Sequence, residues 1–307
     1  YRVTLHSDQD TLAITVVPDD TMASATIDGK QALPGAAHTI RGIPFGTTSI
    51  PVRVTAGDGA TRKTYTVETV RLGRTWQRVF GSSEYDWGND VEQCADSGFI
   101  VVGNRASDDI YAVRLDKNGD TLWTETIDNT AYDDCFSVCR GSNGGFVLAG
   151  TQGYYGRIVF LSAACAVVGQ ANVLPVVQAK GIVPLPDGYL VAGYANTSTG
   201  GKDIVVAELS SDGSLVRADT LGAPGDQRTT GVALYPDNSF LVASYSRIVR
   251  VGWDFSLGWE YLPADGEMFW DAEPTDDGGC VITGHIGSRL LVHRLDNLGD
   301  SVWTAEY

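Results

Sequence analysis

Eleven residues recur almost unchanged 180 positions apart, as RLDKNGDTLWT at 114–124 and RLDNLGDSVWT at 294–304. A second pattern occurs five times, as DSGFIVVG, SNGGFVLAG, LPDGYLVAG, YPDNSFLVAS and TDDGGCVITG. Its anchor residues are spaced by 47, 43, 51 and 40 positions, and they are Phe99, Phe146, Tyr189, Phe240 and Cys280. A recurring unit of this length predicts a tandem array of small, similar structural units.

Each repeat has the pattern of four strands. Two runs that alternate apolar and polar residues flank a turn rich in Asp, Asn and Gly. A third apolar run follows, such as IYAVRL at 110–115, and an Asp-x-x-Gly hairpin then leads into a strand that carries Trp123 or Trp303. Gly119 and Gly299 can adopt the positive φ that this turn needs. Four antiparallel strands per unit, without a helical period, predict an all-β fold with a five-bladed β-propeller.

Two segments compete for the outer-strand position of the last blade. SVWTAEY at 301–307 follows the third strand of the fifth repeat, whereas RTWQRVFG at 74–81 looks like an outer strand that precedes the first repeat. Either one of them is redundant, or the ring closes with the N-terminal strand in the last blade. A truncated six-bladed array is a further alternative, and we favour five blades.

Residues 75–307 resemble the propeller-like repeats of bacterial and archaeal surface and secreted proteins. The residues that carry this resemblance are the outer strands LWTETI and VWTAEY, the GGF-V-AG core strand and the RLD--GD--W hairpin. The resemblance implies an extracellular or cell-surface location and carries no shared activity. The third and fourth repeats depart from the pattern, with ELSSDGSLVR and VGWDFSLGWE in place of the hairpin motif.

Residues 1–72 have a different pattern, in which short alternating segments between Gly and Asp turns predict a small antiparallel β-sandwich. This segment resembles the bacterial cadherin-like β-sandwich domain through ATIDGK, IPVRVTAGDGATRKTYTV and Arg71. The resemblance implies a spacer in a cell-surface protein. We therefore expect a sandwich at 1–72 and a propeller at 75–307, joined by a short linker.

The composition excludes several classes of partner. A net charge of -16 argues against nucleic acid, whose phosphates need a basic surface. No apolar run approaches the ~18 residues of a membrane span. We expect a monomer at the cell surface or outside the cell, where a lipid anchor on a removed N-terminal segment is one route to that location. The expected partner is a glycan or another surface protein.

No metal or cofactor is predicted. The five cysteines match no zinc-binding spacing and are expected to be small buried apolar residues, although a bridged pair stays open: Cys94, Cys135, Cys139, Cys165 and Cys280. The EF-hand calcium pattern is also absent, and a bound cation such as calcium stays an unpredicted alternative.

Candidate channel residues come from counting back from each anchor to the innermost strand. Nine positions back lie Asp90, Ser137, Lys180, Gly231 and Asp271, and seven back lie Glu92, Cys139, Ile182, Ala233 and Glu273. Ring closure would gather Asp90, Glu92, Asp271 and Glu273 on one side of the channel. Two carboxylates ~5–9 Å apart are what glycoside hydrolysis needs, so Asp90 and Asp271 are the candidate catalytic pair. The simpler alternative is a solvated rim, or ion pairs with Lys180 and Arg140.

Aromatic residues follow the same face, in the loops that enter the innermost strands: Tyr85, Trp87, Tyr132, Phe269 and Trp270. Aromatic rings beside carboxylates suit sugars, and the alternative is that these rings wedge between blades. The sequence contains no nucleophile elbow, P-loop or Rossmann fingerprint. We therefore expect a non-enzymatic binding protein with its site between blades five, one and two. A propeller glycosidase is the second hypothesis, and a structural or protein-docking module is the third.

Overall fold

The computed structural model describes residues 1–73, 76–106, 109–127, 132–197, 201–223 and 225–307. Across these ranges it contains strands β1 to β27 and no helix, which confirms the prediction of an all-β chain. Consequently, no described segment is a helix that could span a membrane. The chain forms two compact units, Tyr1–Gln77 and Arg78–Tyr307.

The first unit is built from two sheets. The larger has the order β1-β7-β6-β3-β4 and the smaller pairs β2 with β5. The strands are β1 (Arg2–Leu5), β2 (Leu12–Thr15), β3 (Ser24–Ile27), β4 (Lys30–Ala32), β5 (Ala37–Ile40), β6 (Gly46–Thr55) and β7 (Arg62–Arg71). Ile50, Val52 and Val67 of the larger sheet pack in one core with Leu12 and Ile40 of the smaller. The two-stranded sheet is too small to cover the five-stranded sheet, and a cavity of about 610 Å³ remains beside this core.

The second unit consists of five four-stranded antiparallel sheets, each made from consecutive strands. We call them the first to fifth sheets. The first holds β8 (Trp87–Gln93), β9 (Phe99–Arg105), β10 (Asp109–Leu115) and β11 (Thr121–Ile127), and the second holds β12 (Asp133–Arg140), β13 (Phe146–Gln152), β14 (Tyr155–Leu161) and β15 (Val167–Val173). The third holds β16 (Gln178–Leu185), β17 (Gly188–Asn196), β18 (Lys202–Ser210) and β19 (Leu215–Leu221), and the fourth holds β20 (Thr229–Leu234), β21 (Phe240–Ser244), β22 (Arg247–Val251) and β23 (Leu257–Tyr261). The fifth holds β24 (Glu267–Pro274), β25 (Cys280–Ile286), β26 (Arg289–Leu295) and β27 (Ser301–Glu306).

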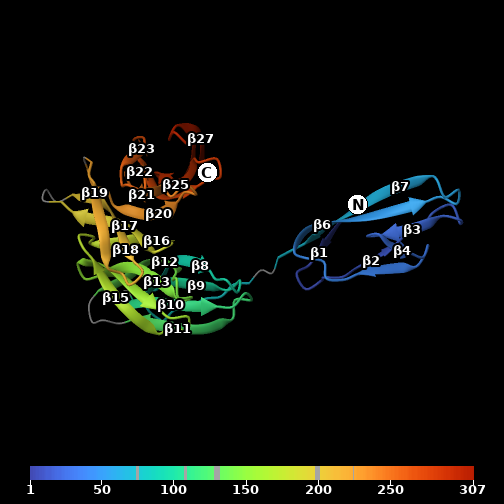
Figure 1. Ribbon diagram of the computed structural model, residues 1–307, viewed down its shortest axis with the longest axis horizontal. Helices are drawn as coiled ribbons and strands as arrows, with labels where there is room; N and C mark the ends of the chain where they lie inside the picture. The colour runs from blue at the N-terminus through green and yellow to red at the C-terminus, as the bar shows by residue number, and fades with distance from the viewer. Residues whose placement is uncertain (74–75, 107–108, 128–131, 198–200, 224) are drawn as a thin grey trace. The chain divides into compact units, whose positions relative to one another are not determined.

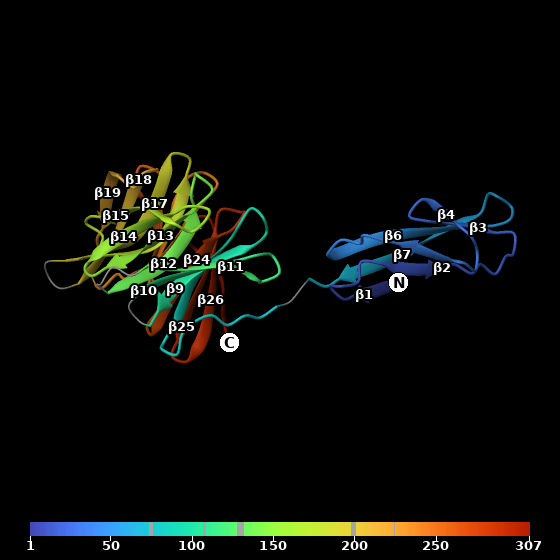
Figure 2. The same ribbon diagram turned by 90° about the horizontal axis from the view of Figure 1, so that it is seen from below.

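The innermost strands β8, β12, β16, β20 and β24 contact one another in chain order. The five sheets therefore follow one another around an arc, with the outer strands on its periphery (Figures 1 and 2). Residues 76–86, part of which was expected to form an outer strand, contain no strand. That expectation was wrong for the described residues, which run as a coil ahead of β8.

Every innermost strand has a bulge at the same place. The pairing with the second strand skips one residue in each sheet, and the skipped residues are Asn89, Phe136, Lys180, Thr230 and Trp270. The next residues, Asp90, Ser137, Gly181, Gly231 and Asp271, resume the pairing. The count from the sequence placed Lys180 in this second set, which was wrong. The third repeat has one residue fewer between the residue that resumes the pairing and the anchor Tyr189. Gly181 therefore resumes the pairing, and Lys180 is the bulged residue.

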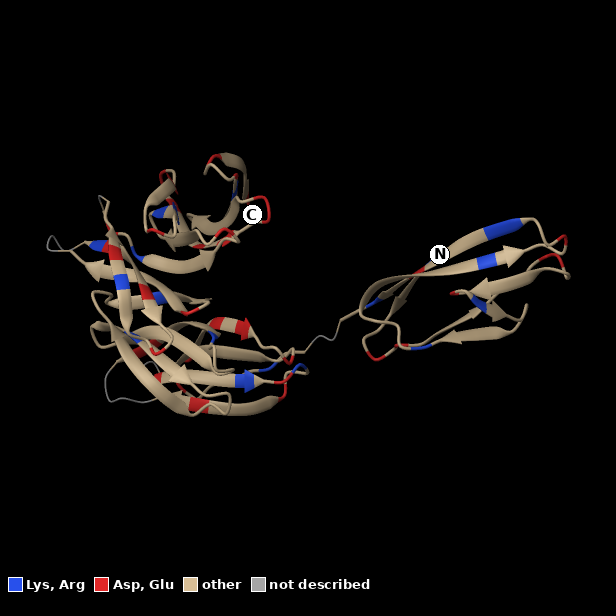
Figure 3. Ribbon diagram, viewed as in Figure 1, with Lys and Arg blue, Asp and Glu red and all other residues tan. Residues whose placement is uncertain are grey.

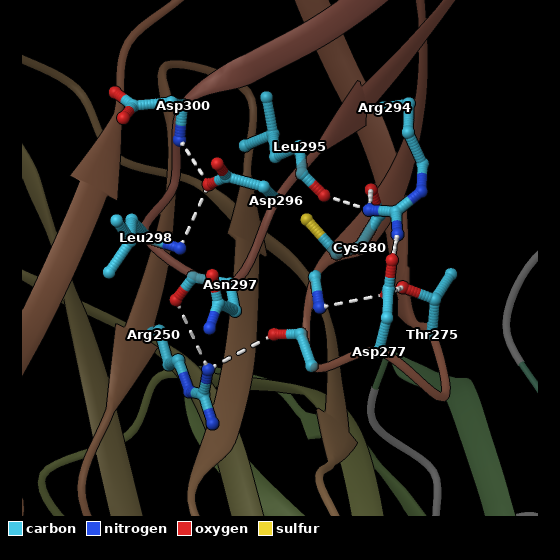
Figure 4. A network of polar contacts seen from close by, with 12 residues as sticks. Arg250, Thr275, Asp277, Cys280, Arg294, Leu295, Asp296, Asn297, Leu298 and Asp300 are labelled. Atoms are coloured by element: carbon cyan, nitrogen blue, oxygen red, sulfur yellow. Dashed lines mark hydrogen bonds and ion pairs between the residues drawn. The ribbon is translucent and has the colours of Figure 1, made fainter.

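The repeated eleven-residue motif connects two hairpins of the same sheet through hydrogen bonds. Figure 4 shows these contacts in the fifth sheet. The Arg294 guanidinium donates to both Asp277 carboxylate oxygens at 2.5 Å, and Arg114 contacts Asp96 in the same way at 2.7 Å. The Asp296 carboxylate accepts bonds from the backbone N–H groups of Leu298 and Asp300 at 2.9 and 3.0 Å, which fixes the turn. The motif is thus structural, because its Arg ties the third strand to the first turn and its Asp shapes the second.

Charged residues of both signs are interspersed over the two units. Figure 3 shows no continuous run of Lys and Arg among the residues coloured there.

Candidate functional site

Three of the predicted acids share one electrostatic neighbourhood. Burial raises the pKa of Asp271 against the lowering effect of the bond from Ala272 N, and the charge of Asp90 raises it further. Burial likewise raises the pKa of Glu273, with additional repulsion from Asp271 and Asp90. Strands β8 and β24 therefore bring the Asp90 charge close enough to disfavour the ionisation of Asp271 and Glu273.

Asp90 also has a structural role. Its Oδ1 accepts a bond from Val91 N at 2.7 Å, and its Oδ2 accepts one from Val138 N of the second sheet at 2.8 Å. Ser137, the next residue of this set, links the second and third sheets through its Oγ and Ile182 N at 3.4 Å. Both carboxylate oxygens of Asp90 thus accept a backbone N–H bond, and the bond to Val138 N ties β8 to the second sheet.

Glu92 lies two residues after Asp90, near the C-terminal end of β8. Its carboxylate accepts a bond from Arg140 Nε at 2.9 Å. A cavity of about 430 Å³ opens there, lined by the Glu92–Arg140 pair together with Leu185 and Tyr189. No cavity was expected on this face, because the hairpins that shape it are short turns.

Trp270 is the best-supported aromatic residue of the predicted set. As the bulged residue of β24 it is 50% exposed. Its ring packs edge-on against Tyr245, with centroids 5.4 Å apart, and its Nε1 donates to His285 Nδ1 at 2.7 Å. The indole is therefore held from two sides while half of its surface stays open, and this is the arrangement of a stacking platform.

The other predicted aromatics are placed differently. Tyr85 and Trp87 are exposed and stack on each other, with centroids 6.3 Å apart and planes at 15°. Tyr132 is also exposed. Phe269 is fully buried between Tyr261 and His293, so its assignment as a ligand contact was wrong. It precedes the bulge and points into the core between the fourth and fifth sheets.

Lys180, which the count from the anchors placed in the channel, contacts the second sheet. Lys180 Nζ is 3.2 Å from the centroid of the Phe136 ring, a cation–π contact between the second and third sheets. Burial lowers the pKa of Lys180 to about 8, against the opposing effect of Asp134 and with further lowering by Arg228. The bulged residues of the second and third sheets thus contact each other, which becomes visible only once the bulge is placed.

This pKa predicts selective chemistry at Lys180. Below pH 8 its ammonium is protonated, and above pH 8 an uncharged amine is available while ordinary lysines stay protonated up to about pH 10.4. Brief treatment with acetic anhydride at pH 8 should therefore acetylate Lys180 ahead of the exposed Lys30. Peptide mass mapping at several reaction times measures the order. Slower labelling at Lys180 than at Lys30 would contradict this assignment.

No group of three or more His, Cys, Asp and Glu within the described ranges is arranged to hold a metal ion. The five cysteines are buried free thiols, and burial raises the pKa of Cys280 to about 11. These thiols are protonated at neutral pH and make poor nucleophiles.

One family model matches the first unit. Residues 1–72 match the family model of the cadherin-like beta sandwich domain. No curated protein matches the sequence.

Several solved structures are similar to the chain. A catalytically inactive virginiamycin B lyase from Staphylococcus aureus, with quinupristin, is 13% identical, with 75% of this chain and 73% of that chain covered at a TM-score of 0.51. A protein of unknown function from Bacteroides caccae is 12% identical, with coverage of 84% and 90% and a TM-score of 0.49. At these identities the likeness concerns the fold alone, and the lyase supports a β-propeller-like arrangement.

Proposed function

We propose that the second unit is a closed five-bladed propeller that binds a glycan on the face where its innermost strands begin. The observation that carries this proposal is the half-exposed Trp270 indole, fixed by Tyr245 and His285. Sugar rings stack their C–H faces on such indoles, and neighbouring polar groups bind the hydroxyls. Asp271 and Glu273 lie one and three residues after Trp270 on β24, and we assign the binding of the hydroxyls to them.

We further propose that the protein acts at the cell surface or outside the cell, with the first unit as a spacer. The match of residues 1–72 to the cadherin-like beta sandwich supports this role. The first unit has an apolar core of its own, which a spacer needs in order to fold independently. A lipid anchor would be one means of attachment, and neither a metal nor a cofactor takes part in the proposal.

A second candidate function is glycoside hydrolysis. It is favoured by the raised pKa values of Asp271 and Glu273, because a general acid must hold its proton near neutral pH. The bonds from Val91 N and Val138 N instead give Asp90 a structural role at the joint between the first and second sheets. Binding without turnover is therefore the main proposal, and a purely structural or docking module is the third.

A glycan array probed with the intact chain tests the binding proposal, followed by a hydrolysis assay on every glycan that binds. Binding without product supports the main proposal. Product formation that is lost in Asp271→Asn moves the assignment to the hydrolase, whereas absence of any glycan binding overturns both.

Asp271 also predicts a dependence of stability on pH. Its pKa is higher in the folded than in the unfolded chain, so its ionisation disfavours folding. This penalty is absent below the unfolded value of 3.8, grows as pH rises through the folded pKa, and is constant above it. Asp271→Asn should therefore raise the melting temperature at pH 7 and leave it unchanged near pH 3. Thermal melts at both values measure this, and a lower melting temperature at pH 7 would contradict it.

A further inference from the structure

The cavity of about 430 Å³ lies at the C-terminal ends of β12 and β16, on a different part of the unit from the fifth-sheet residues that we assign to a glycan. Its lining comes from three sheets and includes Glu92 of the first, Arg140 and Ser142 of the second, and Leu185 and Tyr189 of the third. The volume falls in the range of small-molecule sites, which is roughly 300–1,000 Å³. The cavity is thus large enough for a small ligand and has charged, polar and apolar groups along its wall.

Two side chains at this cavity depart from the repeat. In every sheet one residue of the innermost strand pairs with the anchor of the second strand. In the second sheet this residue is the charged Arg140, whereas the other four sheets have uncharged residues there: Gln93, Pro184, Leu234 and Pro274. The anchor of the third sheet is Tyr189, and no other anchor carries a hydroxyl group. The sheets do not need these polar groups in order to pack, because the other repeats form without them.

The Tyr189 hydroxyl has no hydrogen-bond partner in the part of the chain that the structure describes. Tyr189 is only 3% exposed, and its ring packs edge-on against Phe160, with centroids 5.9 Å apart. Buried hydroxyl groups are nearly always hydrogen-bonded, because an unpaired one has lost its bonds to water. Since Tyr189 lines the cavity, a ligand bound there would supply the missing partner.

The ion pair of Glu92 and Arg140 has unused hydrogen-bonding groups on both sides. Arg140 donates through Nε to Glu92 Oε1 at 2.9 Å, and the Arg140 side chain is 55% exposed. Over the described residues, the two terminal guanidinium nitrogens and Glu92 Oε2 make no further hydrogen bond. A guanidinium group binds a carboxylate through two parallel N–H bonds, and a carboxylate oxygen accepts bonds from an ammonium group. The pair therefore offers adjacent positions for one negative and one positive group.

We propose that this cavity binds a free α-amino acid with an aliphatic side chain. The carboxylate of the ligand accepts bonds from the terminal guanidinium nitrogens of Arg140, and its ammonium group donates to Glu92 Oε2. Both groups of an α-amino acid are attached to one carbon atom, which matches the adjacent positions of Arg140 and Glu92. The Tyr189 hydroxyl donates to the same carboxylate, and the side chain of the ligand contacts Leu185.

The charge of the whole protein favours a zwitterion over an anion in this cavity. The chain has a net charge of -16, and the field of that charge repels a ligand with a net negative charge. A free aliphatic amino acid has no net charge at pH 7. A ligand with a carboxylate alone, such as the C-terminus of a peptide, would also leave Glu92 Oε2 without a donor.

Isothermal titration of the intact chain with three compounds tests the class of ligand. Leucine carries both charged groups, N-acetyl-leucine only the carboxylate, and leucine amide only the ammonium group. We expect leucine to bind at least about 10-fold more tightly than either derivative, because each derivative loses one charged hydrogen-bonding group. Absence of leucine binding overturns the proposal. N-acetyl-leucine that binds as tightly as leucine also overturns it, and assigns the cavity to carboxylates alone.

Substitutions at the lining residues test the position of the site. Arg140→Gln and Glu92→Gln should each weaken leucine binding roughly 10- to 100-fold, and Tyr189→Phe should weaken it about 2- to 10-fold. Tyr189→Phe keeps the ring against Phe160, so its melting temperature should stay close to that of the parent chain. Leucine affinity that is unchanged in Arg140→Gln and Glu92→Gln places the ligand elsewhere and overturns the site.

Arg228→Gln is the matched control. Arg228 pairs through Nε with Asp226 at 3.0 Å, and its side chain is 50% exposed, but it does not line this cavity. It should leave leucine affinity unchanged, and a loss equal to that of Arg140→Gln would overturn the assignment. Trp270→Ala should also bind leucine as the parent chain does, so that failure of the glycan proposal is distinct from failure of this one.

Discussion

Replacing Gly150 by valine is expected to unfold the five-sheet unit. Gly150 is buried on β13, opposite the bulge of β12. A Cβ atom there would lie 1.8 Å from the Asp134 carbonyl oxygen and 3.1 Å from Cys135 Cα. Both are backbone atoms of the paired strand, so relief requires the ladder to separate. The cost should exceed ~3 kcal/mol, a large part of the ~5–15 kcal/mol that stabilises a typical domain.

Gly88→Val on β8 is the matched control for this prediction. Gly88 is also an inner-sheet glycine, but a Cβ atom added to it meets nothing within 4 Å. The Gly88→Val chain should therefore fold normally, and its midpoints of thermal and urea unfolding should be close to those of the parent chain. A Gly150→Val chain with the same unfolding midpoint as Gly88→Val would show that the bulge is not formed in solution.

The glycine of the repeated AG pattern shows which parts of the fold could be predicted from the sequence alone. The same position in four repeats is a glycine: Gly103, Gly150, Gly193 and Gly284. A Cβ atom added to any of them would clash with a carbonyl oxygen of the neighbouring strand. The repeat and its strands follow from apolar alternation, which is a local property of the sequence. The bulge that makes these glycines necessary is a pairing irregularity, and no local pattern signals which residue is skipped.

The same limit explains the errors at the candidate site. Counting from the anchors assumed equal spacing, so one missing residue moved Lys180 from the bulge to the channel set. Phe269 and Trp270 are adjacent in sequence and were both expected to face a ligand, yet one is buried and the other half exposed. Whether an aromatic residue lies in the core or on the face depends on where the strand bulges.

The roles of the acids depended on long-range partners that the sequence does not contain. The engagement of Asp90 by Val138 N and the pairing of Glu92 with Arg140 both join residues about one repeat apart. Composition and charge could indicate an acidic channel, but they could not show which carboxylates are already occupied by backbone or arginine donors. Asp271 and Glu273, which share raised pKa values, are the acids that we assign to a glycan.

Trp270→Ala is expected to weaken glycan binding about 10- to 100-fold, which corresponds to the ~1–3 kcal/mol that a central aromatic anchor contributes. The loss arises because the indole offers an exposed face of fixed orientation, and alanine removes the stacking surface. The fold should tolerate the change, since Trp270 is 50% exposed and lies outside the core of the fifth sheet. Isothermal titration with a glycan identified on the array measures the affinity, and a thermal melt of the same sample measures the stability.

Trp303→Ala is the control, because Trp303 is similarly exposed but lies on β27, away from the entry loops. It should leave glycan affinity unchanged. His285→Ala should give an intermediate loss, since it removes the acceptor that orients the indole and keeps the ring itself. If Trp270→Ala binds as the parent chain does while Arg140→Ala does not, the glycan occupies the 430 Å³ cavity at the opposite end of the innermost strands. If instead Trp270→Ala unfolds the protein and its folded fraction still binds, the indole is a wedge between sheets, and the site lies elsewhere.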